Sequence, residues 1–144
     1  MKNHNNHVTL ILQSRSQNEA FARTATAAFL TPLDPSIDEL TDIKTAVSEA
    51  VTNAIIHGYD DKSDGEIKIV MSLEDREIKI TVTDNGIGIK DIPKAMEPLY
   101  TTKPEMERSG MGFTVIEGFM DTVSVTSAPG EGTCVSMSKK LRCL

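Results

Sequence analysis

A carboxylate followed by two glycines stands directly after an alternating apolar run, a combination suited to binding a ligand. The run from Ile78 to Val82 predicts a strand, and Asp84-Asn85-Gly86-Ile87-Gly88 follows it. Glycine has no Cβ, so the backbone of this loop can adopt positive φ and let a ligand approach its peptide N–H groups. Because a carboxylate only accepts hydrogen bonds, Asp84 would pair with the exocyclic amine of adenine and repel the carbonyl of guanine. We therefore predict a site that selects adenine.

The same loop has a second interpretation, because Asn-Gly between alternating apolar residues is a strong hairpin signal. The return strand would have to pass through Ile89 and would soon reach Pro93, where proline removes a donor from the ladder. Too little strand would remain, which favours the binding loop over the hairpin.

Two pairs of residues with the spacing of a capping box predict two helices ahead of this loop. Ser16 and Glu19 open the first helix, which should end near Leu30. Ser36 and Glu39 open the second, longer helix. Both helices therefore precede the main part of the sheet.

The second helix should run to His57, with Gly58 as its C-cap. Apolar residues at helical spacing predict its core face. These residues are Leu40, Ile43, Val47, Ala50, Val51 and Ala54.

Glu49 and Asn53 lie four residues apart on this helix, on a side turned away from the apolar stripe. A solvated pair of this kind is common on any helix. The alternative is a pocket wall, which Ala46 and Ile56 on the same side favour.

Alternating apolar residues also predict an antiparallel sheet covered by helices on one face only. A half-buried strand at Val8 to Leu12 comes first, and a hairpin with its turn near Asp75 follows the helices. A last pair of strands surrounds Pro129-Gly130. Thr133 alternates in phase with the apolar residues of its strand, so its hydroxyl should face the covered side and need a partner there.

Residues 89–109 lose all periodicity, and a loop of this length in a compact domain is usually functional or disordered. We interpret it as a lid. It leads to Gly110-Met111-Gly112 and a short helix to about Met120. N–H groups at a helix start, together with the helix dipole, favour an anion such as phosphate. The alternative is that these glycines only end the loop.

Composition excludes several classes of protein. With 144 residues the chain is one domain, 1–144, large enough to bury a core. Its formal net charge is -6, and no Lys/Arg run is interleaved with aromatics, which argues against direct nucleic-acid binding. No segment has the length of a signal-peptide core or a membrane span. The two cysteines, Cys134 and Cys143, fit a reducing compartment, so we expect a cytoplasmic protein without a membrane partner.

The Glu49/Asn53 pair, the Asp84–Gly88 loop and Gly110–Gly112 resemble, in order and spacing, the N box, the DxGxG box and the second glycine box of the GHKL ATPases. The longer stretches 47–59, 98–105 and 107–113 look like the anti-sigma F factor family of spore-forming bacteria, which are serine kinases. The resemblance extends along nearly the whole chain.

This resemblance implies a GHKL (Bergerat) fold: an α/β protein of the α+β kind, a two-layer sandwich whose mixed, largely antiparallel sheet carries helices on one face. It implies Mg-ATP held between helices and lid, in a homodimer. It also implies two activities. The protein would bind and inhibit a sporulation sigma factor, sigma F, and would phosphorylate a serine of its anti-anti-sigma antagonist.

The resemblance also implies roles for single residues. Glu49 would be the catalytic base, Asn53 would bind Mg²⁺ and Arg23 would contact a partner. Lys103 and Arg108 would be countercharges from the lid, and the alternative for both is a solvated loop charge. The implied nucleotide-binding residues are Asp84, Gly86, Gly88, Thr101, Thr102, Lys103, Arg108, Gly110, Met111, Gly112 and Thr133.

Two other functions remain open from the sequence. One is an ATP-dependent anti-sigma module that transfers no phosphate. The other is the catalytic fragment of a histidine kinase, which would need an exposed phosphoacceptor histidine on a helix. The helical histidine, His57, is expected at a helix C-terminus, where it more simply favours the helix dipole.

Overall fold

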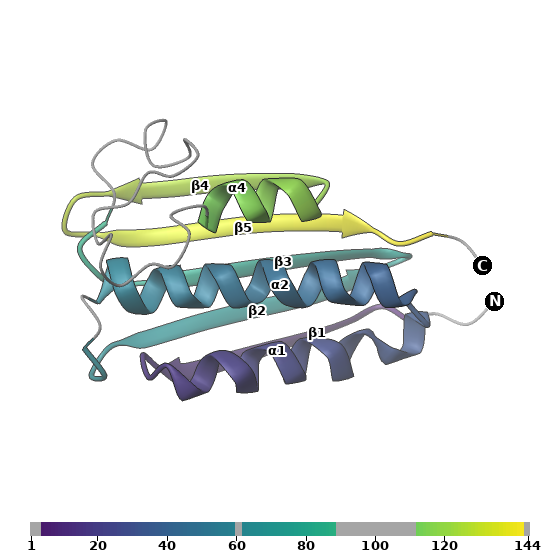
Figure 1. The fold of residues 1–144 in the computed structure, drawn as a ribbon, viewed down its shortest axis with the longest axis horizontal. Coiled ribbons are helices and arrows are strands. Elements are labelled where there is room, and N and C mark those ends of the chain that lie inside the picture. The colour runs from purple at the N-terminus through teal and green to yellow at the C-terminus, as the bar shows by residue number, and fades with distance from the viewer. Residues whose placement is uncertain (1–3, 60–61, 89–111, 143–144) are drawn as a thin grey trace.

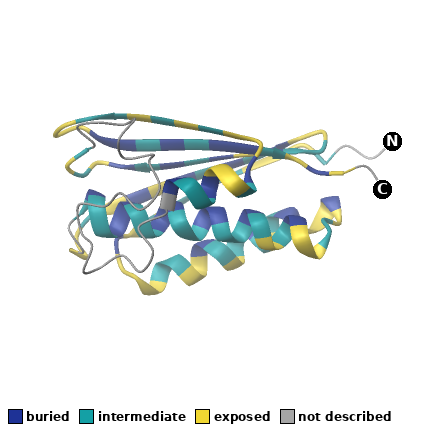
Figure 2. Cartoon of the chain, turned by 45° about the horizontal axis from the view of Figure 1, so that its top comes forward, coloured by how far each residue is buried: buried dark blue, intermediate teal, exposed yellow. Residues whose placement is uncertain are grey.

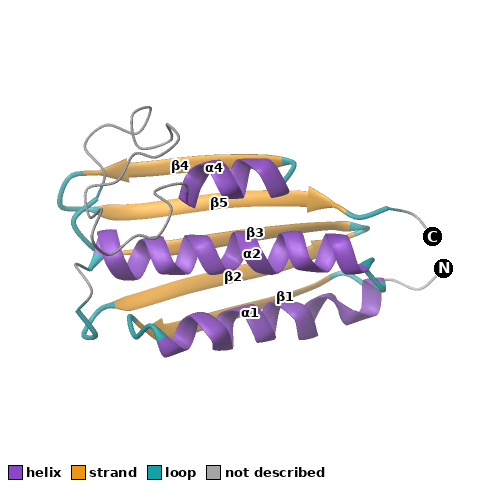
Figure 3. Cartoon of the chain, viewed as in Figure 1, coloured by secondary structure: helices purple, strands orange, loops and turns teal. Residues whose placement is uncertain are grey.

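The computed structural model describes residues 4–59, 62–88 and 112–142, and within them five strands form one sheet with helices on one face (Figures 1 and 3). The strand order is β1-β2-β3-β5-β4. All four pairings between these strands are antiparallel, so the sheet is more regular than the mixed one expected. The predicted two-layer α+β sandwich is confirmed. The strands are β1 (Asn6–Gln13), β2 (Glu66–Glu74), β3 (Glu77–Asp84), β4 (Thr122–Ala128) and β5 (Gly132–Lys140).

The helical layer lies on one side of this sheet, with α2 between α1 and α4 (Figure 1). A 3₁₀ turn, η1, follows α1, and a π-helical turn, η2, continues α2. None of the helices in the described ranges is long and apolar enough to cross a membrane. The helical elements are α1 (Gln17–Leu30), η1 (Thr31–Leu33), α2 (Ile37–Asn53), η2 (Ala54–Gly58) and α4 (Gly112–Phe119).

The core lies between the two layers, where the alternating strand residues meet the apolar stripe of α2 (Figure 2). Burying this surface is the main favourable contribution to folding. The predicted stripe is confirmed, with Leu40 half-buried and the remaining members buried. The fully buried side chains at the centre include Ile43, Val47, Ile67, Ile69, Met71, Ile78 and Ile80.

One of the two predicted capping boxes is confirmed. The Ser36 hydroxyl accepts a hydrogen bond from the Glu39 N–H at 3.1 Å, and the Glu39 carboxylate accepts one from the Ser36 N–H at 2.9 Å. The Ser16–Glu19 box is wrong, because Ser16 already has helical φ and ψ of -58° and -32° and its side chain caps nothing. An N-cap needs extended backbone. The Glu19 carboxylate instead accepts a hydrogen bond from Ser48 on α2.

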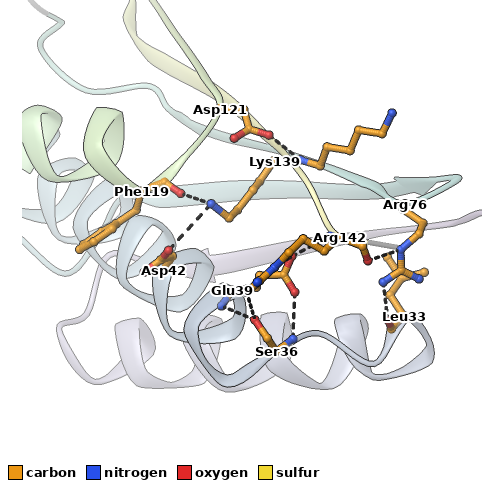
Figure 4. Close-up of polar contacts among 10 residues, drawn as sticks. Leu33, Ser36, Glu39, Asp42, Arg76, Phe119, Asp121, Lys139 and Arg142 are labelled. Atoms are coloured by element: carbon orange, nitrogen blue, oxygen red, sulfur yellow. Dashed lines mark hydrogen bonds and ion pairs between the residues drawn. The ribbon is translucent and has the colours of Figure 1, made fainter. Parts of the chain in front are cut away.

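Glu39 also fixes the chain that follows β5 (Figure 4). Its second carboxylate oxygen accepts a hydrogen bond from the Arg142 N–H at 2.8 Å, while the Arg142 guanidinium donates to the Ser36 hydroxyl at 3.3 Å. Burial raises the pKa of Glu39, but the hydrogen bonds from the Ser36 and Arg142 N–H groups outweigh it and leave the pKa below its usual value. The start of α2 is therefore joined to the end of the sheet.

The confirmed box generates a stability prediction. Ser36→Ala should lower the free energy of unfolding by about 1 kcal/mol, because the first turn of α2 loses its side-chain acceptor. Ser16→Ala is the matched control and should change it by less than about 0.5 kcal/mol. Urea unfolding of both variants measures the difference. Equal losses in the two variants would contradict the assignment of the caps.

Candidate functional site

The ends of several elements gather at one end of the sheet, opposite the two chain termini (Figure 1). They are the last turn of α2 and η2, the end of β3, the turn between β4 and β5, and the start of α4. Asn53 is the last residue of α2, Asp84 the last of β3 and Gly112 the first of α4. The described members of the three sequence boxes thus lie at one end of the molecule.

A row of polar side chains crosses three strands at this end. In the strand register Asp84 pairs with Thr133, and Thr133 pairs with Ser127. The preceding row on the same face consists of Val82, Val135 and Val125 and belongs to the core or packs against it. Asp84 and Thr133 are only 4% and 5% exposed. The prediction that Thr133 faces the covered side is confirmed, and its hydroxyl contacts that of Ser127 at 2.9 Å.

The Asp84 carboxylate is held by backbone groups. Oδ1 accepts a hydrogen bond from the Gly86 N–H at 2.9 Å, which makes a local Asx turn. Burial raises the pKa of this carboxyl above its usual value, and the backbone N–H groups of Gly86 and Thr133 oppose the shift. A ligand N–H group that donates to this carboxylate would oppose the rise in its pKa further. A ligand with a hydrogen-bond donor at this point would therefore stabilise the charged form of Asp84.

The hairpin interpretation of Asn85-Gly86 is wrong. Strand β3 already has β2 on one edge and β5 on the other, so a strand returning from Gly86 would find no edge of β3 to pair with. Residues 85–88 form no strand. The interpretation of Asp84–Gly88 as a binding loop therefore remains.

The glycines of this loop are required by contacts within the protein. A Cβ on Gly86 would lie 1.9 Å from the carbonyl oxygen of Gly58, and the Ile87 N–H donates to that same carbonyl at 3.0 Å. Gly88 has a φ of +78°, and a Cβ there would lie 2.0 Å from the Ala128 carbonyl oxygen. These glycines let the loop touch η2 on one side and the β4–β5 turn on the other, which fixes its shape.

Gly58 was expected to cap the second helix, and this expectation is wrong. Its φ is not positive, and Tyr59 occupies the capping position, with its N–H donating to the Ala54 carbonyl at 3.0 Å in a π-type bond. Gly58 is needed for another reason. A Cβ there would lie 2.8 Å from the Asp84 carboxylate. The Tyr59 hydroxyl adds a further link, accepting from the Asn85 N–H at 2.7 Å and donating to the Glu66 carbonyl.

Glu49 and Asn53 are both half-buried, beside a fully buried Ala46. At about 1.5 Å of rise per residue, Glu49 precedes Asn53 by about 6 Å along α2, and the π-helical turn η2 leads from Asn53 to Gly58. Gly58 lies against Asp84. The Asn53 amide is therefore farther along the helix from the buried Asp84 carboxylate, and the Glu49 carboxylate is farther still. This order suits an elongated ligand with its donor group at Asp84 and its charged end toward α2 and α4.

The N-terminus of α4 is a source of backbone N–H groups at the same end of the molecule, since Gly112 begins this eight-residue helix. The lid at 89–109 lies outside the described residues. So do Thr101, Thr102, Lys103, Arg108, Gly110 and Met111.

A hollow of about 230 Å³ borders the polar row at the end of the sheet, and no residue of α2 lines it. It therefore follows the strand ends and the β4–β5 turn. Its walls are Thr83, Asp84, Thr126, Ser127, Ala128, Glu131, Gly132, Thr133 and Cys134.

Arg23 lies on α1, with 43% of its side chain exposed, and pairs with Glu19 at 3.4 Å. Glu19 accepts a hydrogen bond from Ser48, the neighbour of Glu49 on α2. The arginine is thus linked through one carboxylate to the helix that carries the candidate base.

Three residues of the site were not predicted as such: Gly58, Tyr59 and Ser127. Gly58 and Tyr59 act by contacts with a loop far away in the sequence, which no local pattern reveals. Ser127 had a usable signal, because it alternates in phase with Val123 and Val125 and so faces the helices.

Comparisons with known proteins agree with this geometry. A family model described as the histidine kinase-like ATPase domain matches residues 12–139. The anti-sigma F factor of Clostridium botulinum (strain Eklund 17B / Type B) is 61% identical over 139 residues, covering 96% of this chain and 97% of that protein. That of Bacillus subtilis (strain 168) is 54% identical over 136 residues, covering 94% of this chain and 93% of that protein.

Solved structures share the fold. The RsbU and RsbW domains of a Mycobacterium tuberculosis protein align with a TM-score of 0.68 at 20% identity, covering 94% of this chain and 32% of that chain. The catalytic domain of the histidine kinase ThkA aligns with a TM-score of 0.59 at 15% identity, covering 94% of this chain and 96% of that chain. Because the family model matches residues 12–139 and the identities are 54–61% over nearly the full length, the chain belongs to the anti-sigma F factor family within the GHKL histidine kinase-like ATPases.

Proposed function

We propose that this chain is a cytoplasmic anti-sigma factor and an ATP-dependent protein serine kinase. It binds and inhibits a sporulation sigma factor, sigma F, and inactivates its anti-anti-sigma antagonist by phosphorylating a serine. The observation that carries the nucleotide part is the buried Asp84 carboxylate, set in a glycine-tightened loop beside the end of the helix that bears Asn53 and Glu49.

The nucleotide fits the groups that the site offers. Asp84 and Thr133 accept hydrogen bonds from the adenine end, and Gly86 and Gly88 shape the wall beside it. The N-terminus of α4 at Gly112 provides N–H groups and a positive dipole for phosphate. We extend the phosphate contacts to Thr101, Thr102, Lys103, Arg108, Gly110 and Met111 on the basis of the family resemblance.

The side-chain oxygen of Asn53 is a suitable ligand for Mg²⁺, which usually enters such sites with substrate phosphates and keeps several waters. When bound, the ion neutralises charge on the phosphate oxygens. Glu49 stands one helical turn from Asn53 and orients or deprotonates the serine hydroxyl. Phosphoryl transfer needs little more from a protein than such positioning and charge neutralisation.

The partners follow from the family. Its members carry the name anti-sigma F factor, which identifies a sigma factor as the bound protein. Arg23 is the proposed contact residue; it is half-buried on α1 and pairs with Glu19. We propose a homodimer, as in the family. A second function, a sigma-binding module without transfer activity, is separated by one assay, in which radiolabelled ATP either delivers label to a serine of the antagonist or does not.

Glu49→Gln should lower phosphate transfer by at least about 100-fold while nucleotide affinity changes little, because the amide cannot take the hydroxyl proton. Transfer is measured with γ-labelled ATP, and binding with a fluorescent ATP analogue. Glu117→Gln, at an exposed carboxylate on α4, is the matched control and should keep full transfer. Undiminished transfer by the Glu49 variant would remove this residue as the base.

Asp84→Asn should reduce the preference for ATP over GTP by about 10- to 100-fold, because the amide can present a donor to the guanine carbonyl. Competition titrations of both nucleotides measure the ratio. Asp75→Asn, at the exposed β2–β3 turn, is the control and should leave it unchanged. An unaltered ratio in the Asp84 variant would refute the proposed base contact.

Arg23→Ala should weaken sigma-factor binding by about 10-fold or more, since an interface arginine is often a dominant contact. Nucleotide affinity should stay within about twofold of the parent chain, because Arg23 lies on α1 and the site residues on other elements. Lys68→Ala, on the face of β2 away from the helices, is the control. If surface plasmon resonance gives equal sigma affinities for all three proteins, the partner surface lies elsewhere.

A further inference from the structure

We infer that Ser127 is a specificity-determining residue, because it directs the Thr133 hydroxyl so that Asp84 and Thr133 both present hydrogen-bond acceptors to the ligand, which selects adenine over guanine. This inference rests on the nucleotide site proposed above. It assigns the selection to a pair of hydroxyls in addition to the Asp84 carboxylate.

The direction of the hydroxyl follows from counting hydrogens. Ser127 Oγ lies 2.7 Å from the Gly132 carbonyl oxygen, which only accepts, so Ser127 donates its one hydrogen there. Ser127 Oγ also lies 2.9 Å from Thr133 Oγ1. With the serine hydrogen used, the hydrogen in this second bond belongs to Thr133. Thr133 Oγ1 is left with lone pairs only.

The Gly132 carbonyl, which accepts the hydrogen of Ser127, is held in place by close backbone packing. Gly132 has a φ of +84°, and a Cβ there would lie 2.1 Å from the Asp84 carbonyl oxygen. The β4–β5 turn therefore packs directly on the end of β3. Because Ser127 pairs with Thr133 in the strand register, the two hydroxyls are held opposite each other on neighbouring strands.

Thr133 is the cross-strand neighbour of Asp84, and both residues are at least 95% buried, at 5% and 4% exposure. Inside a protein an unsatisfied polar group is costly, so the direction of a buried hydroxyl matters more than it would in water. Asp84 and Thr133 together offer acceptors. An exocyclic amine brings two N–H donors, whereas the guanine carbonyl would meet two acceptors and leave its own lone pairs unpaired.

Without Ser127 the selection should weaken. A Thr133 hydroxyl released from the serine can rotate and donate to a ligand carbonyl. Ser127→Ala in the full chain should therefore reduce the ratio of ATP to GTP affinity by about fivefold to tenfold, mostly through tighter GTP binding. Isothermal titration with ATP and with GTP measures the ratio.

The matched controls lie close by. Ser124→Ala changes an exposed serine on the other face of β4 and should leave the ratio unchanged. Ser127→Thr keeps a hydroxyl and should keep the ratio of ATP to GTP affinity of the parent chain. In a Thr133→Val background Ser127→Ala should have no further effect, since the serine acts through Thr133. Should Ser127→Ala fail to fold, Ser127→Cys, nearly isosteric with a poor donor, takes its place.

The outcomes separate this inference from the function on which it rests. If the parent chain shows no ATP preference, or Asp84→Asn leaves it intact, the proposed base contact fails. If Asp84→Asn removes the preference but Ser127→Ala keeps the parent ratio, the Ser127 inference alone is overturned. An equal effect of Ser127→Ala in the Thr133→Val background would also overturn it.

Discussion

The close contact of three backbone segments holds the site together. The end of η2, the Asp84–Gly88 loop and the β4–β5 turn touch through positions where any Cβ would collide with a carbonyl or a carboxylate, at Gly58, Gly86, Gly88 and Gly132. Glycine at these positions lowers stability, because it loses more backbone conformational entropy on folding than any other residue. These close contacts hold the buried Asp84 carboxylate in a fixed position.

The Asp84 carboxylate is costly to bury, and among the described residues backbone donors offset part of that cost. The N–H groups of Gly86 and Thr133 oppose the rise in the pKa of Asp84, yet burial still dominates. A ligand that brings a hydrogen-bond donor stabilises a buried carboxylate further. In the proposed function that donor is the exocyclic amine of adenine, and the neighbouring hydroxyl pair extends the same preference.

The opposite end of the molecule is fixed in a different way. There, charged side chains tie the segment after β5 to the helices: Arg142 joins the capping box of α2, and the Arg76 guanidinium donates to the carbonyls of Leu33 and Arg142 at 3.0 and 2.8 Å. Lys139 donates to the last carbonyl of α4 at 2.8 Å and pairs with Asp42 on α2 at 3.8 Å (Figure 4). These links anchor α2 and α4 at the end away from the site, and so fix the helices whose other ends form it.

The sequence by itself determined the elements, because helical and strand periodicity, the Ser36–Glu39 box and the turn residues are local signals. It also placed Asp84 at a strand end and Thr133 on the covered face, because side chains alternate along a strand. The Ser16 box and the Gly58 cap were wrong for one reason: Glu19 and Gly58 are used by partners on other elements, Ser48 and Asp84, that lie far away in the chain. Only the tertiary structure decided that β3 has both edges occupied, that the glycines serve contacts between backbones, and that the hydroxyls of Ser127 and Thr133 contact each other. These are contacts between segments distant in sequence, and spacing along the chain does not encode them.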